Sequence, residues 1–373
     1  MEKNPFRISG IVTGKYFIDR ADELRAVLGT MQGQGEKMLV YGQRRMGKSS
    51  ILLNAAARLR KGKGKVVYAD ISPATSVTDV ANIILHAFNK ETGGTLNWMD
   101  ALRQIKIGFN VSHDGVPSLD VSLKNKSEQE QLARLTEVLD SLDAYASKKK
   151  LTLIIDEFQK MVEFGAEEAE WQLRSAIQHH QYLNHIYAGS QTRIIDQMLM
   201  KDRAFYRFFE ILSIGPIDNE FMAQWIDGRF ENAFGQTYEA GAACVRLAGP
   251  RTRDVVKLAR KTFILAQGTK KKVKGLAEAA LEQLVREEDD FLRPQWDHLP
   301  NIQKDLLKAI ASGVKAITSK ETIAQFGLPS SSNLAYHLRV LGEDDVLEKS
   351  SDGYKFENPF FGKWVALSLK LNA

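Results

Sequence analysis

The stretch that decides the fold is LVYGQRRMGKSSIL, residues 39–52, in which an apolar run leads into two glycines and Lys-Ser-Ser before apolar residues return. The spacing of Gly42, Gly47, Lys48 and Ser49 fits the pattern G-x-x-x-x-G-K-[ST]. A strand that turns sharply into a helix needs glycine where a side chain would obstruct it, and the N–H groups at the helix start then converge on an anion. The stretch therefore predicts a phosphate-binding loop, the P-loop.

The P-loop pattern assigns a chemical role to each polar side chain that follows its second glycine. Lys48 reaches the β- and γ-phosphates of a nucleotide as a point charge, and the Ser49 hydroxyl suits Mg²⁺. Ser50 beside it joins the predicted nucleotide-binding set. The predicted cofactors are therefore ATP and Mg²⁺.

A second motif, LIIDE at residues 153–157, ends an apolar run in two carboxylates. Asp156 at the end of a buried strand is placed to hold Mg²⁺, and Glu157 is placed to orient and polarise an attacking water. A third candidate is Ser190, at the end of the apolar stretch HIYAGS. It fits a γ-phosphate sensor and a helix N-cap equally well, and the two roles are compatible.

The order of apolar segments predicts the fold class. Helical patterns alternate with short apolar strands, which is typical of a mainly parallel sheet between two layers of helices. We predict an α/β, three-layer P-loop NTPase core of the additional-strand class. Its strands are expected at residues 37–42, 65–72, 151–158, 185–190 and 210–217.

The pattern changes along the chain in a way that predicts three domains. The core spans 1–217 and carries an antiparallel β-ribbon insertion near 104–123, turning at His113-Asp114-Gly115. The helical patterns in residues 218–294 predict a helical lid domain. Residues 295–373 contain three helical patterns followed by two short strands around Asp352-Gly353, which predicts a winged helix-turn-helix domain.

Composition limits the class of protein. Of the 373 residues, 44% are hydrophobic and 26% are charged, as in ordinary globular proteins, and the net charge of +5 permits an anionic partner without demanding one. The single cysteine, Cys244, excludes a disulfide within the chain. Because there is no signal-type start and no run of about 18 apolar residues, we expect a cytoplasmic protein with no membrane partner.

Several of these features together resemble a known family. They are Asn4-Pro5-Phe6, the stretch FIDRADEL at 17–24, YGQRRMGKSS, IIDEFQK, the segment AFYRFFEILSIGPI at 204–217 and the terminal winged helix. In this order they resemble the archaeal-type ATPases of the STAND and AAA+ group over nearly the whole chain. That family couples a P-loop ATPase core to a helical lid and a winged helix, and it includes relatives of replication initiators and signalling switches.

The resemblance implies further roles at the nucleotide. Phe17 and Ile18 would line the adenine pocket, with Arg20 nearby, and Ser190 would be the first sensor. The lid would supply a second sensor from the stretch AGPRTR, for which Arg251 and Arg253 both stand as candidates.

The resemblance also implies an arginine finger donated across a subunit boundary in an oligomer. Arg207, in AFYRFFEIL, is the candidate, and Arg203 is the alternative. This stretch lacks the proline and glycine of the family's usual PLYGR-like sequence.

These features predict a Mg²⁺-dependent ATPase that acts as a conformational switch. One alternative is a DNA-associated AAA+ ATPase that oligomerises on nucleic acid, and another is a nucleotide-binding scaffold without hydrolysis. The expected partners are ATP and ADP, a second copy of the chain, and a protein bound by the winged helix. DNA is compatible but not demanded, because the expected recognition helix holds only His337 and Arg339 as cations and ends in three acids.

Overall fold

The computed structural model describes the chain at residues 3–18, 20–93, 109–111, 117–119, 127–164, 166–190, 193–235, 238–268, 275–350 and 353–371. The chain divides into two compact units, which are considered separately. One unit is formed by residues 9–215, and the other by residues 1–8 together with 216–373. The division expected after residue 217 remains a prediction for the domain boundary.

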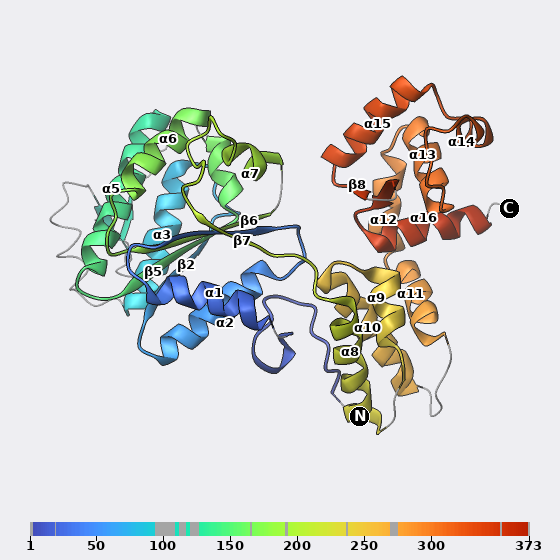
Figure 1. Cartoon of the computed structure of the whole chain (residues 1–373), viewed down its shortest axis with the longest axis horizontal. Helices are drawn as coiled ribbons and strands as arrows, with labels where there is room; N and C mark the ends of the chain where they lie inside the picture. Colours follow the sequence, from blue (N-terminus) through green and yellow to red (C-terminus); the bar gives the residue numbers. More distant parts are fainter. Residues whose placement is uncertain are drawn as a thin grey trace. The chain divides into compact units, whose positions relative to one another are not determined.

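The first unit is built on a five-stranded sheet with the order β2-β5-β6-β1-β7 (Figure 1). Every pairing in this sheet is parallel. Strand β6 lies between β1 and β5, which confirms the predicted additional-strand arrangement. The strand expected at 210–217 ends earlier, at Ser213. The strands are β1 (Lys37–Gly42), β2 (Lys65–Asp70), β5 (Leu151–Asp156), β6 (Asn184–Ser190) and β7 (Glu210–Ser213).

Alternate side chains of the central strands enter two separate cores, one on each face of the sheet. Ile154 and Ile186 pack with α1 and α2, whereas Leu153 and Tyr187 pack with the helices of the opposite face. This alternation gives the three-layer arrangement that the apolar pattern predicts. The helices of the first face are α1 (Ala21–Gln32) and α2 (Lys48–Lys61). Those of the second are α3 (Val77–Thr92), α5 (Glu128–Ala146), α6 (Ala166–Ile177) and α7 (Arg193–Met198).

Local sequence signals fix where the long helices of the second face begin. The Ser76 side chain accepts a hydrogen bond from the N–H of Asp79 at the start of α3. Ser127 and Glu130 form a reciprocal capping box at the start of α5. Of the predicted ribbon, the structure describes an antiparallel pair, β3 (Phe109–Val111) and β4 (Pro117–Leu119). The turn expected at residues 113–115 lies outside the described residues.

The second unit begins with an aromatic core among the lid helices. The rings of Trp225, Phe230 and Phe263 surround Phe6, whose side chain is fully buried. Arg260 donates from Nη1 to the Phe6 carbonyl at 2.9 Å. The segment around Phe6 therefore packs with the lid helices rather than with the core domain in which we expected it. The lid helices are α8 (Asn219–Phe234), α9 (Gly241–Ala248), α10 (Thr252–Gly268) and α11 (Leu276–Glu287).

The rest of the second unit contains the expected winged helix. Ser319 caps α14 by accepting from the N–H of Thr322, as the sequence suggests. Trp364 packs inward and donates from Nε1 to Asp289 at 2.7 Å. The elements are α12 (Asp289–Asp297), α13 (Asn301–Ala311), α14 (Lys320–Phe326), α15 (Ser331–Glu343), β8 (Leu347–Ser350), β9 (Gly353–Phe356) and α16 (Pro359–Leu371). Within the described part of the chain, every helix is too short or too polar to cross a bilayer.

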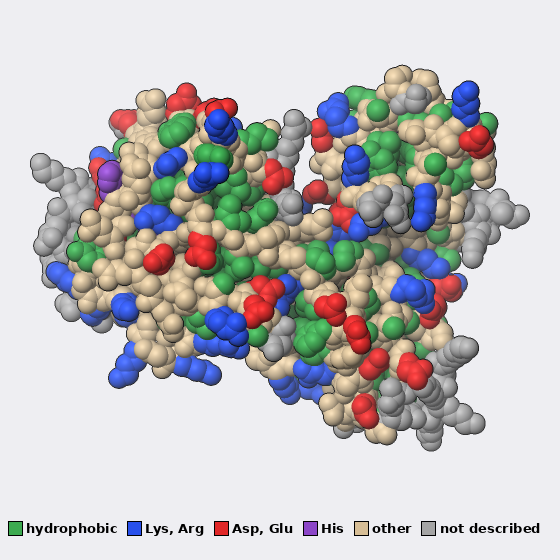
Figure 2. All heavy atoms as spheres, in the orientation of Figure 1, with side chains coloured by type: hydrophobic (Ala, Val, Ile, Leu, Met, Phe, Trp, Pro, Cys, Tyr) green, Lys and Arg blue, Asp and Glu red, His purple; other side chains and the backbone are tan. Residues whose placement is uncertain are grey.

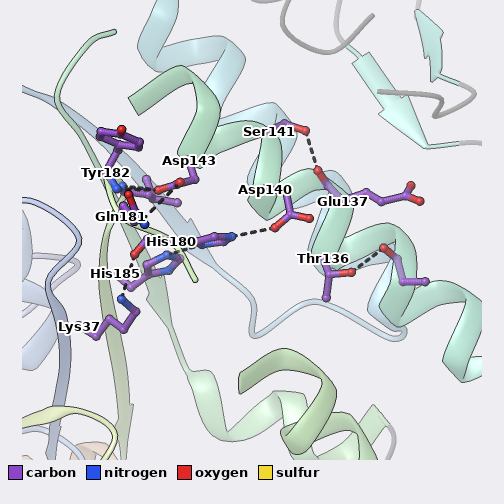
Figure 3. A network of polar contacts seen from close by, with 12 residues as sticks. Lys37, Thr136, Glu137, Asp140, Ser141, Asp143, His180, Gln181, Tyr182 and His185 are labelled. Carbon is purple, nitrogen blue, oxygen red and sulfur yellow. Dashed lines mark hydrogen bonds and ion pairs between the residues drawn. The ribbon is translucent and has the colours of Figure 1, made fainter. Parts of the chain in front are cut away.

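A chain of polar contacts starts from β6 at the edge of the sheet where its strands begin (Figure 3). His180 lies 2.9 Å from Asp140 through Nε2 and 2.9 Å from His185 Nε2 through Nδ1. His185 in turn lies 3.0 Å from the Tyr187 hydroxyl. His185 is fully buried, and burial lowers its pKa well below the ordinary value, with His180 and Lys37 acting in the same direction.

This network predicts an acid-sensitive fold. In the unfolded chain His185 takes up a proton near pH 6.5, whereas in the folded protein it stays neutral to a lower pH. The unfolded state therefore binds more protons below about pH 6.5. The free energy of unfolding should fall as the pH drops from 7 towards 5, by at most about 1.4 kcal/mol per pH unit from this group.

Urea unfolding between pH 5 and 8 measures the effect. We expect His185→Gln to flatten the pH dependence and His179→Gln, at an exposed histidine, to leave it unchanged. An unaltered slope in His185→Gln would show that this histidine is not the group responsible.

Candidate functional site

The site lies where three neighbouring parallel strands end. Gly42 at the end of β1 is in register with Ser190 at the end of β6, and Asp156 ends β5 on the other side of β6. The carboxyl ends of neighbouring parallel strands meet at one edge of the sheet. The structure therefore brings the P-loop, Asp156 and Ser190 to the same edge, as their positions in the sequence predict.

The two glycines of the P-loop are required by its backbone. A Cβ on Gly42 would lie 2.3 Å from the carbonyl oxygen of Ile214, so no side chain fits there. Gly47 has φ = +98° immediately before α2, a conformation that favours glycine. The loop can thus bend into the helix and direct the N–H groups of the first turn of α2 towards an anion.

Lys48 lies folded over the loop. Its side chain is 7% exposed, and Nζ donates to the carbonyls of Gly42 at 2.8 Å and Gln43 at 3.0 Å. Burial lowers the pKa of the Lys48 ammonium, and the nearby carboxylates of Glu157 and Asp156 act in the opposite direction. A poorly hydrated cation beside converging N–H groups favours a highly charged anion such as a triphosphate.

Ser49 and Asp156 are in direct contact. The Ser49 hydroxyl donates to Asp156 Oδ2 at 2.6 Å, and the backbone N–H of Glu157 donates to Oδ1 at 3.0 Å. The Asp156 side chain is 3% exposed. A hydroxyl and a carboxylate are hard oxygen ligands of the kind Mg²⁺ takes beside a nucleotide. These two residues therefore fit a magnesium ion.

Tyr68 on β2 is a site residue that the sequence reasoning did not find. Its hydroxyl donates to Asp156 Oδ2 at 2.5 Å. Burial, followed by the charge of Asp156, raises the pKa of Tyr68 well above its ordinary value, so the phenol stays protonated. A tyrosine within a strand is common, so the sequence alone does not single out Tyr68. Its role follows from the pairing of β2 with β5 in the sheet.

Glu157 follows Asp156 in an uncommon backbone conformation. Its φ is +61°, in the left-handed region that few non-glycine residues occupy. The side-chain amide of Gln159 donates to the Glu157 carboxylate. A Cβ on Gly189 of β6 would lie 2.8 Å from the Gln159 side-chain oxygen, so this glycine leaves room for the amide. Gln159 was also not predicted as a site residue.

The segment expected to bind adenine lies against the P-loop side of the sheet. Ile18 is buried, and Phe17 packs partly buried on the core formed with α1 and α2. Arg20 forms an ion pair with Glu23 and donates to the carbonyls of Met46 at 3.2 Å and Gly215 at 2.9 Å. Through its hydrogen bond to the Met46 carbonyl, Arg20 thus stabilises the backbone of the P-loop.

The Ser50 side chain contacts the backbone of the N-terminal segment near residue 12. Its hydroxyl accepts from the N–H of Val12 at 3.2 Å, and Asn54 donates to the Val12 carbonyl at 2.8 Å. Residues near 12 therefore run along the first turns of α2. In this structure Ser50 therefore binds the segment that runs along α2. Asn54, which contacts the same segment, was not identified from the sequence.

The two finger candidates differ in their surroundings. Arg203 forms an ion pair with the buried carboxylate of Glu170 on α6. Arg207 is exposed, has φ = +52° and lies over the ring of Tyr206 at 5.3 Å. Of the two, only Arg207 presents its guanidinium at the surface with no carboxylate of the described residues bound to it.

The second-sensor candidates also differ. Arg251 is buried and donates to Glu348 Oε2 at 2.6 Å and to the Glu357 carbonyl at 2.6 Å, with Glu357 Oε1 at 3.3 Å. Both acids belong to the winged-helix region, so Arg251 ties the start of α10 to that region. Arg253 is exposed in the first turn of α10.

This tie predicts a stability effect. Removing a buried charge leaves its partners uncompensated, and Arg251→Met should lower the free energy of unfolding of the second unit by about 3–5 kcal/mol. The exposed pair Arg246–Glu278 offers a control, because Arg246→Ala should cost no more than about 1 kcal/mol. Calorimetry on the two variants tests this, and equal losses would contradict a structural role for Arg251.

The sheet order and the bent loop between β1 and α2 define a P-loop fold of the additional-strand class. Residues 17–192 match the family of ATPase domains found predominantly in Archaea, and residues 292–367 match a probable winged helix domain. The chain therefore contains a domain similar to these ATPase domains, followed by a domain similar to a winged helix.

The chain is similar to solved structures at low sequence identity. A Walker-type ATPase of Pyrococcus abyssi is 18% identical, with 97% of this chain and 99% of that chain covered and a TM-score of 0.61. The ORC2 protein of Aeropyrum pernix is 13% identical, with 100% and 99% covered and a TM-score of 0.47. Cdc6p of Pyrobaculum aerophilum is 13% identical, with 94% and 92% covered and a TM-score of 0.42. The first likeness supports the fold. No curated protein sequence matches the chain.

Proposed function

We propose that this protein binds ATP with Mg²⁺ and hydrolyses it, and that the cycle works as a conformational switch. The observation that carries the proposal is the contact at 2.6 Å between the Ser49 hydroxyl and the Asp156 carboxylate, directly beside the P-loop. Two motifs more than a hundred residues apart meet there with the ligands a nucleotide-bound magnesium needs. When bound, the ion would neutralise phosphate charge.

The residues of the chain then divide the work of hydrolysis. The N–H groups of the P-loop and Lys48 hold the phosphates, and Ser190 at the end of β6 is the candidate sensor of the γ-phosphate. Glu157 orients the attacking water and accepts its hydrogen bond. In the present structure Gln159 donates to one oxygen of that carboxylate. The remaining acceptor positions are available to orient the water.

Arg207 is the residue that we assign as a finger acting on a neighbouring copy. An exposed arginine cannot stabilise charge at a distant site of its own chain, but it can reach the nucleotide of a second copy in an oligomer. A finger supplied in trans contributes about 10³–10⁵ in turnover. Arg203 is less suited, because Glu170 already binds its guanidinium.

The lid and the winged helix would convert the nucleotide state into a signal. Arg253, exposed in α10, is better placed for the second-sensor role than Arg251, which the acids of the winged-helix region occupy. Through Arg251 a movement of the lid would carry the winged helix with it. The partner proposed for the winged helix is a protein.

Charge supports a protein partner over DNA. In α15, Arg339 pairs with Glu343 at 3.0 Å, and two further acids follow at 344 and 345. On the face shown in Figure 2, basic and acidic side chains are interspersed rather than gathered into one basic surface. Strong binding to nucleic acid needs clustered Lys and Arg.

Phosphate release tests the proposal directly. We expect the wild-type protein to release phosphate from ATP in the presence of Mg²⁺ and to release none in EDTA. If Arg207 acts in trans, the rate of ATP hydrolysis per molecule should rise with protein concentration. Arg207→Ala should remove that concentration dependence, with the exposed Arg25→Ala as control. Turnover that persists in EDTA would overturn the role of the metal.

A further inference from the structure

We propose that Tyr68 is a positioning residue for the aspartate of the metal site, and that its hydroxyl sets the affinity for Mg²⁺ in the nucleotide complex. The inference rests on the proposed function and adds a residue outside both sequence motifs. It follows from how the Asp156 carboxylate is held.

Three donors from the described residues reach the Asp156 carboxylate. Oδ1 accepts from the N–H of Glu157, and Oδ2 accepts from the hydroxyls of Ser49 and Tyr68. Ser49 is itself a proposed ligand of the metal, so its hydroxyl has a second task. The Tyr68 hydroxyl is therefore the side-chain donor that can remain on Asp156 while Ser49 serves the metal.

The register of the sheet explains why a tyrosine reaches this carboxylate. On the parallel pair of β2 and β5, Asp70 is opposite Asp156 and Tyr68 is opposite Ile154. Tyr68 and Asp156 are thus diagonal neighbours on one face of the sheet, and the long tyrosine side chain spans the offset between them. The tyrosine hydroxyl, at the far end of the ring, meets the carboxylate from this position, and phenylalanine would leave the oxygen without that donor.

The hydroxyl matters more than the packing of the ring. Tyr68 is only partly buried and lines a pocket of about 660 Å³ together with Pro73, Ile83 and other residues of the α3 region. Removing one oxygen atom therefore leaves the hydrophobic core unchanged. A donor behind a metal-binding carboxylate fixes its orientation, and the loss of such a donor typically costs about 10–100-fold in metal affinity or activity.

The experiment compares wild type, Tyr68→Phe and Tyr145→Phe. Tyr145 is a half-buried tyrosine on α5, on the helical layer that packs the other face of the sheet. Binding of a fluorescent ATP analogue is titrated at fixed protein with increasing Mg²⁺ and in EDTA, and the thermal midpoint of each variant is recorded. Phosphate release is then measured over the same Mg²⁺ range.

For Tyr68→Phe we expect a rise of about 10–100-fold in the Mg²⁺ concentration that gives half of the full Mg²⁺ effect on nucleotide binding. Nucleotide affinity in EDTA and the thermal midpoint without nucleotide should stay close to wild type, as should every property of Tyr145→Phe. A Mg²⁺ dependence equal to that of wild type would overturn the inference and leave the proposed function standing. If nucleotide binding by wild type itself did not respond to Mg²⁺, the metal part of the proposed function would fail, and this inference with it.

Discussion

Lys48→Ala is expected to weaken nucleotide binding by about 100-fold or more while leaving the protein folded. Charge-assisted hydrogen bonds contribute about 1.5–3 kcal/mol each, and Lys48 is placed to form them with two phosphates. The ammonium is buried beside the loop, where it donates to the carbonyls of Gly42 and Gln43, so a mobile surface cation is not in a position to replace it.

Two measurements check this expectation, a titration with a fluorescent nucleotide and the thermal stabilisation given by ATP. Lys61→Ala is the matched control, because this lysine ends the same helix and is exposed. It should bind nucleotide as wild type does. If ATP stabilises Lys48→Ala as much as wild type, the loop is not the nucleotide site.

Glu157→Gln is expected to lower ATP hydrolysis by about 10²–10⁴-fold with little change in nucleotide affinity. The amide has the shape of the carboxylate but cannot act as a base, and positioned bases contribute factors of this size. Lys48 and the loop N–H groups, which bind the phosphates, are unaltered. The variant should therefore hold ATP and accumulate the ATP-bound state.

Single-turnover phosphate release together with equilibrium binding separates the two effects. Glu163→Gln serves as control, because Glu163 lies in the next helical segment (Phe158–Phe164), where it pairs with Lys160 at the surface. Equal phosphate release from wild type and Glu157→Gln would contradict the role of Glu157 and favour a nucleotide-binding scaffold.

The features that could be predicted from the sequence are those that depend on residues close together in the chain. The P-loop needs Gly42, Gly47, Lys48 and Ser49 at fixed spacing within one turn, and strand β5 is an unbroken apolar run that ends in its acids. The order of the strands placed Ser190 beside them. These assignments depend on local backbone geometry, which a short stretch of residues determines by itself.

The features that were missed depend on contacts between distant segments. Tyr68 reaches Asp156 only because β2 pairs with β5 in one register. Arg251 meets two acids about a hundred residues away, and Phe6 packs among the lid helices rather than on the core domain. In each case the side chain is ordinary in its local sequence, and its partners are set by the tertiary fold.

The central claim is that one bent stretch of backbone encloses a triphosphate whose metal lies at Ser49 and Asp156. A crystal of the protein with a non-hydrolysable ATP analogue and Mn²⁺ tests it, through the anomalous signal of the manganese. We predict a single strong peak between the Ser49 hydroxyl and the Asp156 carboxylate, next to the phosphates in the loop. A peak elsewhere, or a triphosphate bound away from residues 42–49, would contradict the account.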